Sequence, residues 1–306
     1  MKEKTSRRKP HIIAFLLSVL LLCVCFVCLF PVITGTPLNV WIMQKRLAHS
    51  GYIIHAGGKL KGGDGKNYKH ANSIDGMQFM YDKGNRIVEM DFAFTTDGEC
   101  VCLHTWEETC YTNDNDQKDK DKEGIPLSYD DFKSVKIYGY FTPTALSDVL
   151  GFLETHKDVV LVTDIKETFQ PIAGTDEKED VFALCRRIDE MAPHLKDRCI
   201  IQIYDEAEYD GVKDLGFSNI IYTLYQLPEE KQLDTAAHQL FSEEHPLVAV
   251  TFPKALLKNE NFMEGMHHLK VPVFVHTIDN AKKRKKLMTE KTVTGIYTNN
   301  TTHPEI

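Results

Sequence analysis

The sequence predicts an α/β fold, a distorted (β/α)8 TIM barrel preceded by one N-terminal transmembrane helix. Short apolar runs recur from residue 52 onward, and segments with helical spacing separate most of them. This alternation is typical of parallel α/β proteins, of which the eight-stranded barrel is the simplest at this length. The first forty residues have a different composition, with a basic flank followed by an apolar stretch.

The N-terminal region predicts a retained membrane anchor at residues 12–33, behind a basic cytoplasmic tail at 1–11. The run from Ile12 to Phe30 is uncharged. At 1.5 Å per residue it is ~28 Å long, close to the ~30 Å hydrocarbon core of a bilayer. Basic residues stay in the cytoplasm, so we expect a single-pass plasma-membrane protein with an extracytoplasmic catalytic domain. A cleaved signal peptide is the alternative, although Pro-Val-Ile-Thr-Gly-Thr is a poor cleavage site.

Residues 34–50 are expected to form a linker with a short helix, and residues 51–306 the barrel. The strands are expected in nine apolar runs, at 52–55, 86–91, 100–104, 159–164, 199–203, 219–224, 247–252, 272–277 and 295–298. Helical spacing between them is found at 73–83, 145–156, 180–191 and 279–289. Nine runs are one too many for the barrel. The link between the second and third runs, 86–91 and 100–104, is also too short for a helix. We therefore expect one layer of the barrel to be thinner at this link.

Charge and cysteine content exclude some classes of function. A net charge of −8 argues against nucleic acid as a partner, because a phosphate-binding protein needs a basic face. It does not exclude an anionic substrate, since a bound cation can reverse the local field. Of eight cysteines, five lie beyond the anchor, an odd number that predicts small buried side chains more than a disulfide framework.

Carboxylates follow two of the apolar runs at a spacing that places them together. Glu89 and Asp91 are two residues apart, so an extended strand points both to the same side. Asp164 and Lys166 repeat this arrangement after the run at 159–164. Neighbouring carboxylates repel unless a cation lies between them, and three carboxylates suit Ca²⁺ or Mg²⁺ better than zinc.

Two histidines stand in a comparable position. His55 and His104 each follow a buried apolar run and precede turn or polar residues. One imidazole can accept a proton from an attacking hydroxyl while a second protonates a departing alkoxide. The chain contains 13 histidines, so most of them have ordinary structural roles.

In these motifs the chain resembles the glycerophosphodiester phosphodiesterase family, within the phosphoinositide phospholipase C-like phosphodiesterases. The resemblance covers residues 52–299 in the family's order. The matching segments read His55-Ala-Gly57, Asn72-Ser73, Glu89-Met-Asp91, Thr96-Asp97-Gly98, His104-Thr105, Thr142-Pro143-Thr144-Ala145-Leu146, Asp164-Ile-Lys166, His276-Thr277-Ile278-Asp279 and Gly295-Ile296-Tyr297-Thr298-Asn299.

The resemblance implies a distorted TIM barrel and a metal-dependent phosphoric diester hydrolase. It implies that His55 and His104 form the catalytic acid–base pair. Glu89, Asp91 and Asp164 would bind one divalent cation, Ca²⁺ or Mg²⁺. Substrate-binding residues would be Lys166, with Lys59 and His276. The substrate would be a small-molecule or lipid-derived phosphodiester.

The chain departs from the family pattern at the mouth of the predicted barrel. Ala56 stands where the family usually has an arginine that holds the phosphate, a contact of ~1.5–3 kcal/mol. Thr105 replaces the usual Asp, Asp164 is shorter than the usual Glu, and His276 replaces an aromatic residue. Lys59 is a possible substitute for the arginine, but as a point charge. The opening His-Ala-Gly-Gly suggests an atypical subgroup.

Three functions are therefore compared. The first is a membrane-anchored phosphodiesterase acting on glycerophosphodiesters or related phospholipid-derived diesters. The second is a catalytically inactive barrel that binds a phosphorylated envelope or lipid ligand, which the missing arginine favours. The third is a metal-independent phospholipase C, in which a basic residue replaces the cation. The third is disfavoured because three inward carboxylates would lack a partner.

Overall fold

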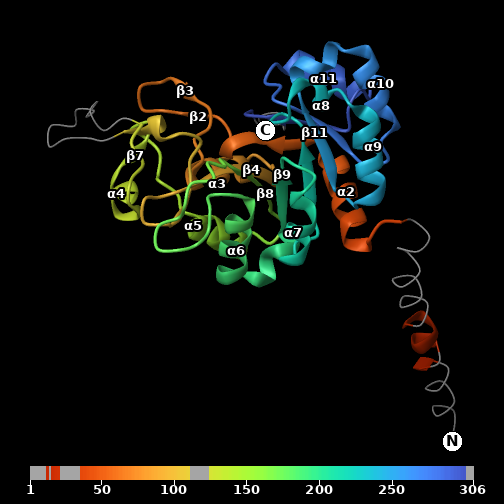
Figure 1. Ribbon diagram of the computed structural model, residues 1–306, viewed down its shortest axis with the longest axis horizontal. Coiled ribbons are helices and arrows are strands. Elements are labelled where there is room, and N and C mark those ends of the chain that lie inside the picture. The colour runs from red at the N-terminus through yellow and green to blue at the C-terminus, as the bar shows by residue number, and fades with distance from the viewer. Residues whose placement is uncertain (1–11, 14, 21–34, 111–123, 301–306) are drawn as a thin grey trace, which may run out of the picture.

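A closed barrel of eight parallel strands forms the centre of the molecule in the computed structural model, which describes residues 12–13, 15–20, 35–110 and 124–300 (Figure 1). The strands are β1 (Tyr52–Ile54), β4 (Ile87–Phe94), β8 (Val160–Ile165), β9 (Cys199–Ile203), β10 (Ile220–Thr223), β11 (Ala249–Pro253), β12 (Val273–His276) and β13 (Gly295–Thr298). Each pairs in parallel with the next, and β1 pairs with both β13 and β4, which closes the ring. The predicted TIM barrel is confirmed.

One of the nine predicted runs, at 100–104, does not form a barrel strand. Residues 100–102 form β5 (Cys100–Cys102), which pairs antiparallel with the end of β4 outside the ring. The chain between β5 and β8 then holds α4 (Tyr129–Ser134), a small sheet of β6 (Thr109–Cys110) and β7 (Lys136–Ile137), and α5 (Leu146–Thr155). The expectation of a thinned layer was wrong, because α5 supplies the helix between β4 and β8.

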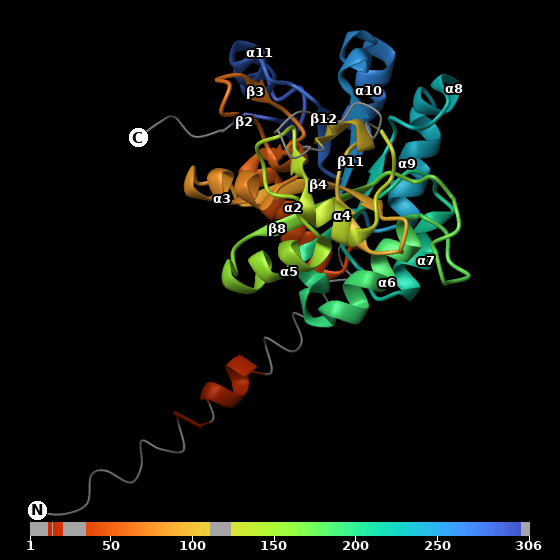
Figure 2. The same cartoon turned by 90° about the vertical axis from the view of Figure 1, so that its left-hand side faces the viewer.

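Helices surround the barrel on its outer side (Figure 2). They are α3 (Ile74–Asp82), α5, α6 (Val181–Met191), α7 (Glu208–Asp214), α8 (Glu229–Gln232), α9 (Thr235–Glu244), α10 (Glu260–His268) and α11 (Ala281–Thr289). One further helix, α2 (Leu38–Ser50), lies across the bottom of the barrel. The four predicted helical segments correspond to α3, α5, α6 and α11. Side-chain caps fix several starts; Ser73 accepts a hydrogen bond from Gly76 N at the start of α3. Cys100, Cys102, Cys185 and Cys199 are free and buried, as expected of small core side chains.

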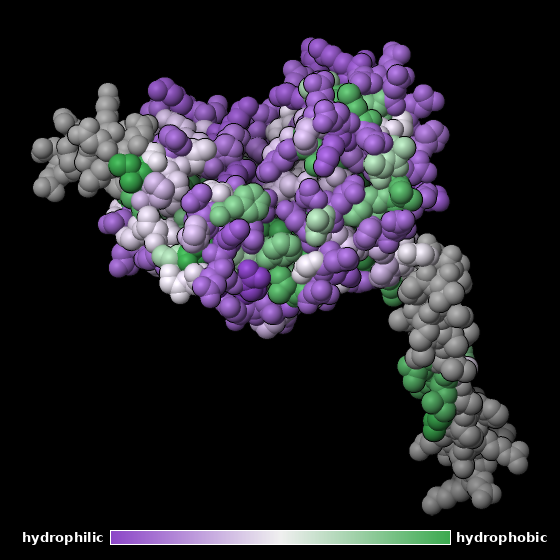
Figure 3. Space-filling model, viewed as in Figure 1, coloured by the Kyte–Doolittle hydropathy of each residue, from purple (hydrophilic) through white to green (hydrophobic). Residues whose placement is uncertain are grey.

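The predicted membrane anchor is not supported. No helix within residues 12–13, 15–20, 35–110 and 124–300 has both the length and the apolar character to cross a bilayer. Apolar side chains are exposed in the helical residues 12–13 and 15–20 near the N-terminus (Figure 3). This finding overturns the predicted plasma-membrane location, and the predicted contact with a membrane is not shown. The predicted tail, 1–11, and the remainder of the predicted anchor, residues 14 and 21–33, lie outside the described residues.

Side chains alternate along each barrel strand, and this alternation positions the site. On β4, Val88, Met90 and Phe92 pack outward in the main core, whereas Ile87 belongs to a separate cluster inside the barrel. Glu89 and Asp91 follow Ile87 at intervals of two, so they point inward above it. The strand pairing sets Asp91 directly beside Asp164 of β8. Two acids on neighbouring strands therefore share one level of the barrel interior.

The lower end of the interior is apolar and closed. Its cluster contains one or more side chains from each of the eight strands, together with Val40, Met43 and Leu47 of α2. Helix α2, expected to be part of a linker, thus covers the bottom of the barrel. The polar residues are confined to the opposite end, where the strands reach their carboxyl ends.

Candidate active site

Three buried carboxylates meet at the carboxyl ends of β4 and β8. Glu89, Asp91 and Asp164 each offer an oxygen within 4.8 Å of the others. All three are almost completely buried, with exposed fractions of 1%, 0% and 5%. The two strands are neighbours in exact Asp91–Asp164 register, which explains why residues 73 positions apart come together.

Lys166 lies between two of these carboxylates. Its Nζ is 2.7 Å from Asp91 Oδ1 and 2.8 Å from Asp164 Oδ2. Burial lowers the pKa of Lys166, but Asp91 and Asp164 outweigh that effect and hold it above its usual range. Burial likewise raises the pKa of Asp91, yet Lys166, with His55 and His104, outweighs it and holds that pKa below its usual range. Lys166 is therefore a charged ammonium that offsets one of the two negative charges of the aspartate pair.

Two tyrosines complete the surroundings of Asp164. The Tyr204 hydroxyl donates to Asp164 Oδ1, and the Tyr225 hydroxyl lies 3.0 Å from Oδ1 and 3.2 Å from Oδ2. Burial first, and then the Asp164 charge, raises the pKa of both tyrosines, so both remain protonated donors. Asn72 plays the same part for Asp91: its Nδ2 donates to Oδ2 at 2.7 Å and its Oδ1 accepts from the Asp91 backbone N–H at 2.9 Å.

Glu89 differs from the other two acids. Its Oε2 accepts from the Ala56 backbone N–H at 2.6 Å, while its Oε1 is buried and has no hydrogen-bond partner among the described residues. Burial, followed by the Asp91 and Asp164 charges, raises the pKa of Glu89 well above its usual value. A buried acceptor without a partner beside two more carboxylates suits an oxygen-preferring divalent cation. The residues present therefore fit the metal that the family resemblance implies.

The hydrogen bonds of His55 specify its tautomer. Asn299 Nδ2 lies 3.1 Å from both oxygens of Asp279, and a carboxylate only accepts. The amide oxygen of Asn299 must therefore face His55 Nδ1, at 3.0 Å, and Nδ1 must carry the proton. Lys69 holds Asp279 in turn, with Nζ 2.6 Å from Oδ2. This chain leaves His55 Nε2 with a free lone pair, the arrangement of a general base.

His104 is held by a carboxylate of its own. Its backbone N–H donates to Glu108 Oε2 at 3.3 Å, and its Nδ1 lies 3.6 Å from Glu108 Oε1. Burial lowers the pKa of His104 and raises that of Glu108 to about 7. His70 packs between the two predicted catalytic histidines, with ring centroids 5.0 Å from His55 and 4.7 Å from His104.

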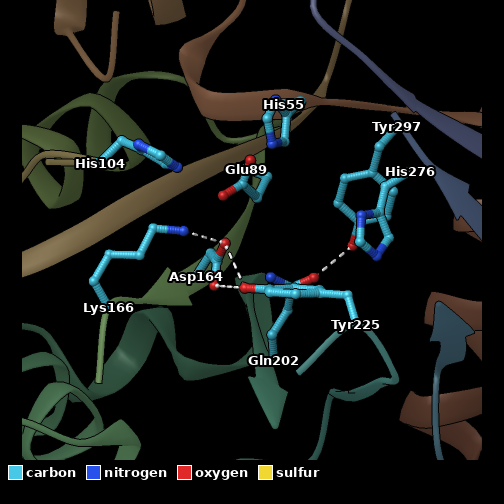
Figure 4. A pocket seen from close by; sticks show the side chains of 9 residues that line it. All are labelled: His55, Glu89, His104, Asp164, Lys166, Gln202, Tyr225, His276 and Tyr297. Carbon is cyan, nitrogen blue, oxygen red and sulfur yellow. Dashed lines mark hydrogen bonds and ion pairs between the residues drawn. The ribbon is translucent and has the colours of Figure 1, made fainter. Parts of the chain in front are cut away.

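These residues surround one cavity of about 190 Å³ (Figure 4). His104 and Lys166 lie on one side, His276 and Tyr297 on the other, and Glu89 and Asp164 between them. Burial, followed by repulsion between the protonated forms of His276 and His55, lowers the pKa of His276 to about 3, so this ring is neutral at pH 7. The cavity is lined by His55, Glu89, His104, Asp164, Lys166, Gln202, Tyr225, His276 and Tyr297.

Of the residues predicted for the site, Lys59 alone is absent from the described surroundings of the cavity and its acids. It follows the short 3₁₀ turn at His55–Gly57, where its backbone N–H donates to Asn299 O at 2.7 Å. The turn also explains Ala56, whose φ of 50° aims its N–H at Glu89. Contact of Lys59 with a substrate stays a prediction.

Several residues at the site were not predicted from the sequence. They are His70, Glu108, Gln202, Tyr204, Tyr225 and Tyr297. The role of Asn299 in holding His55 was not predicted either. Tyr204 and Tyr225 stand just beyond β9 and β10, so their place after apolar runs was an available signal. His70 lies two residues after β3 (Asn67–Tyr68), and Glu108 ends a 3₁₀ turn at Trp106–Glu108. Neither residue follows a barrel strand, and no pattern distinguishes them.

Comparisons with known proteins agree with this architecture. The model of the glycerophosphoryl diester phosphodiesterase family matches residues 62–303. The fold is similar to that of a glycerophosphodiester phosphodiesterase from Parabacteroides distasonis, at TM-score 0.58 and 18% identity, covering 81% of this chain and 93% of that one.

Two further solved structures have similar folds. One from Thermotoga maritima has TM-score 0.56 and 16% identity over 81% of this chain and 94% of that chain, and is a glycerophosphodiester phosphodiesterase. The other is an Oleispira antarctica phosphodiesterase in complex with the product sn-glycerol-3-phosphate. It has TM-score 0.55 and 14% identity, covering 82% of this chain and 95% of that chain. A search of curated proteins found no match. At these identities the solved structures establish a shared fold.

Proposed function

The chain belongs to the glycerophosphoryl diester phosphodiesterase family, a family of phosphoric diester hydrolases, and we propose that it hydrolyses glycerophosphodiesters or related phospholipid-derived diesters at the mouth of its barrel. The observation that carries this proposal is the pairing of two imidazoles with three buried carboxylates and Lys166 around one cavity. The solved phosphodiesterase with bound sn-glycerol-3-phosphate supports a small glycerol-containing product.

We assign the proton transfers from the hydrogen bonds. His55 Nε2 would accept the proton of the attacking hydroxyl, because Asn299 holds the other nitrogen protonated. His104 would donate a proton to the departing alkoxide. Glu108 beside its Nδ1 stabilises the protonated ring when the carboxylate is charged.

Glu89, Asp91 and Asp164 would hold the divalent cation, for which Ca²⁺ and Mg²⁺ are the candidates. When bound, such an ion would supply positive charge to a phosphate oxygen. Lys166 shares two of these carboxylates and keeps its charge at the same end of the cavity. His276, neutral and on the far side, would contact the alcohol portion of the substrate.

One observation favours metal-independent catalysis as the second candidate. The Lys166 ammonium pairs with both Asp91 and Asp164 and offsets part of their charge, as a basic residue would in an enzyme without a cation. Glu89 Oε1 argues the other way, because that buried oxygen is left without a partner among the described residues. We therefore place metal-dependent hydrolysis first.

Hydrolysis by the full-length protein tests both candidates. Glycerophosphocholine and glycerophosphoethanolamine would be incubated with the protein in EDTA, and then with Ca²⁺, Mg²⁺ or Mn²⁺ restored. Metal-restored release of glycerol phosphate, absent in His104→Ala, is the expected result. Turnover that persists in EDTA would favour the metal-independent candidate. Absence of turnover under all conditions, with metal-dependent stabilisation retained, would favour a binding protein without catalysis.

A further inference from the structure

A second cluster of metal-binding groups lies beside the three carboxylates. His70, His104 and Glu108 each offer one ligand atom within 4.8 Å of the other two. Nδ1 of His104 is 3.6 Å from Glu108 Oε1, and Nδ1 of His70 is 4.0 Å from the same oxygen. Two imidazole nitrogens thus face one carboxylate oxygen. The two imidazole side chains are about one-third exposed, so an ion has access from solvent.

Glu108 lacks a strong cationic partner in its buried position. Its side chain is 8% exposed, and in the part of the chain that the structure describes no Lys or Arg forms an ion pair with it. The Tyr138 hydroxyl donates to Oε1 at 2.8 Å and the His104 backbone N–H to Oε2 at 3.3 Å. Burial also lowers the pKa of His70 to about 4, so His70 is a neutral ring with an available lone pair. A buried carboxylate facing two neutral imidazoles is more favourable with a cation among them.

We propose that His70, His104 and Glu108 form a second, transition-metal site, for which Zn²⁺ is the fitting ion. Two imidazoles and one carboxylate form a ligand set that zinc uses, with a further position open to water. The carboxylate cluster, in contrast, offers oxygen ligands only, which suit Ca²⁺ and Mg²⁺. The two neighbouring sites therefore differ in the ions they select.

The effect on catalysis follows from His104, and this part rests on the proposed function. An imidazole that coordinates zinc through Nδ1 carries its proton on Nε2 and cannot exchange protons near neutral pH. Zn²⁺ at this site would therefore withdraw His104 from acid–base chemistry. The expected consequence is an enzyme that a hard cation supports and Zn²⁺ inhibits.

Cobalt absorption tests the site without reference to activity. The full-length protein would be saturated with Ca²⁺, in a reductant that does not bind metals, and then titrated with Co²⁺. We expect visible absorption of four-coordinate Co²⁺ with nitrogen ligands, which an equivalent of Zn²⁺ abolishes. Asp91→Asn should retain the absorption. His70→Ala should weaken binding by at least about tenfold, and Glu108→Gln should do the same. His268→Ala, at an exposed histidine, is the matched control.

Absence of the band in wild type, or its retention in both His70→Ala and Glu108→Gln, would overturn the proposed site. Circular dichroism of each variant excludes loss of the fold. A second experiment measures activity. Zn²⁺ should inhibit the Ca²⁺-saturated enzyme, and the same inhibition of His70→Ala should require a Zn²⁺ concentration at least about tenfold higher. Equal inhibition of wild type and His70→Ala would overturn the inference that Zn²⁺ at this site inhibits catalysis. A protein without turnover that still shows the cobalt band would refute the proposed function and leave the metal site standing.

Discussion

The two ends of the barrel interior are built from the same strands but have opposite character. At the bottom, Ile87, Val160, Ile200 and Phe274 form a buried apolar cluster that α2 covers. At the mouth, two or four residues further along the same strands, the inward side chains are acids, imidazoles, tyrosines and amides. Strands β4, β8, β9 and β12 therefore change from apolar to polar along their inward faces.

Within a single strand, β4, the residue that stabilises the fold therefore differs from the residues expected to act in the chemistry. Ile87, Glu89 and Asp91 occupy successive inward positions of β4, yet only the first belongs to the apolar cluster. The bottom stabilises the barrel by burying apolar area. The mouth holds buried carboxylates that cost free energy unless a charge partner is present. Substitutions at the two ends should therefore have separable effects.

The largest expected effect is on turnover at the mouth. In His55→Ala, kcat should fall by about 10²–10⁴-fold because a positioned proton acceptor is lost. The melting temperature should change little, because the side chain is only partly buried. Steady-state kinetics and thermal unfolding measure the two. His268→Ala provides the control, and turnover retained in His55→Ala would refute the assignment of the base.

The second effect is on stability at the bottom. Ile200→Ala removes a side chain that is 0% exposed, and should reduce the free energy of unfolding by about 2–5 kcal/mol. Below its melting temperature the variant should keep the wild-type kcat, since the change is remote from the mouth. Urea denaturation and kinetics at low temperature test this. A folded variant with unchanged stability and lost turnover would break the separation between the two ends.

The third effect concerns the cation. Wild type at a metal concentration of about 100 Kd should gain ~2.7 kcal/mol of stability, seen as a rise in melting temperature. Glu89→Gln should gain much less, because it removes a charged ligand oxygen. In EDTA at pH 7 the variant should be at least as stable as wild type, since burial raises the pKa of Glu89. A metal-induced rise equal to that of wild type would locate the ion elsewhere.

The smallest effect is the pH dependence that Glu108 introduces. Its pKa is raised from 4.5 to about 7 by burial, so folding favours the protonated acid. That contribution is fully present below pH 4.5, the unfolded value, and is lost as the pH rises through about 7. Relative to Glu108→Gln, wild type should therefore lose about 1–3 kcal/mol between pH 4.5 and 8 in EDTA. Urea denaturation across this range measures it, and parallel pH profiles for the two proteins would contradict the assignment.

The barrel could be predicted because its signals are local. Apolar runs at 159–164 and 199–203, with helical spacing between them, became β8, α6 and β9. The strand-end residues Glu89, Asp91 and Asp164 were predictable for the same reason: side-chain alternation and parallel register depend on short segments. The antiparallel pairing of β5 was not, because an apolar run does not show which neighbour a strand pairs with.

The sequence by itself determined the barrel, its family motifs and the set of strand-end residues, since each depends on spacing within one segment or on a linear order of motifs. Tertiary structure alone decided which groups surround them. The ion pairs of Lys166, the tautomer of His55 and the meeting of His70 with Glu108 join residues on different segments. Packing brings those residues within a few ångströms of one another, and only at such distances do charge, burial and hydrogen bonding set their chemistry.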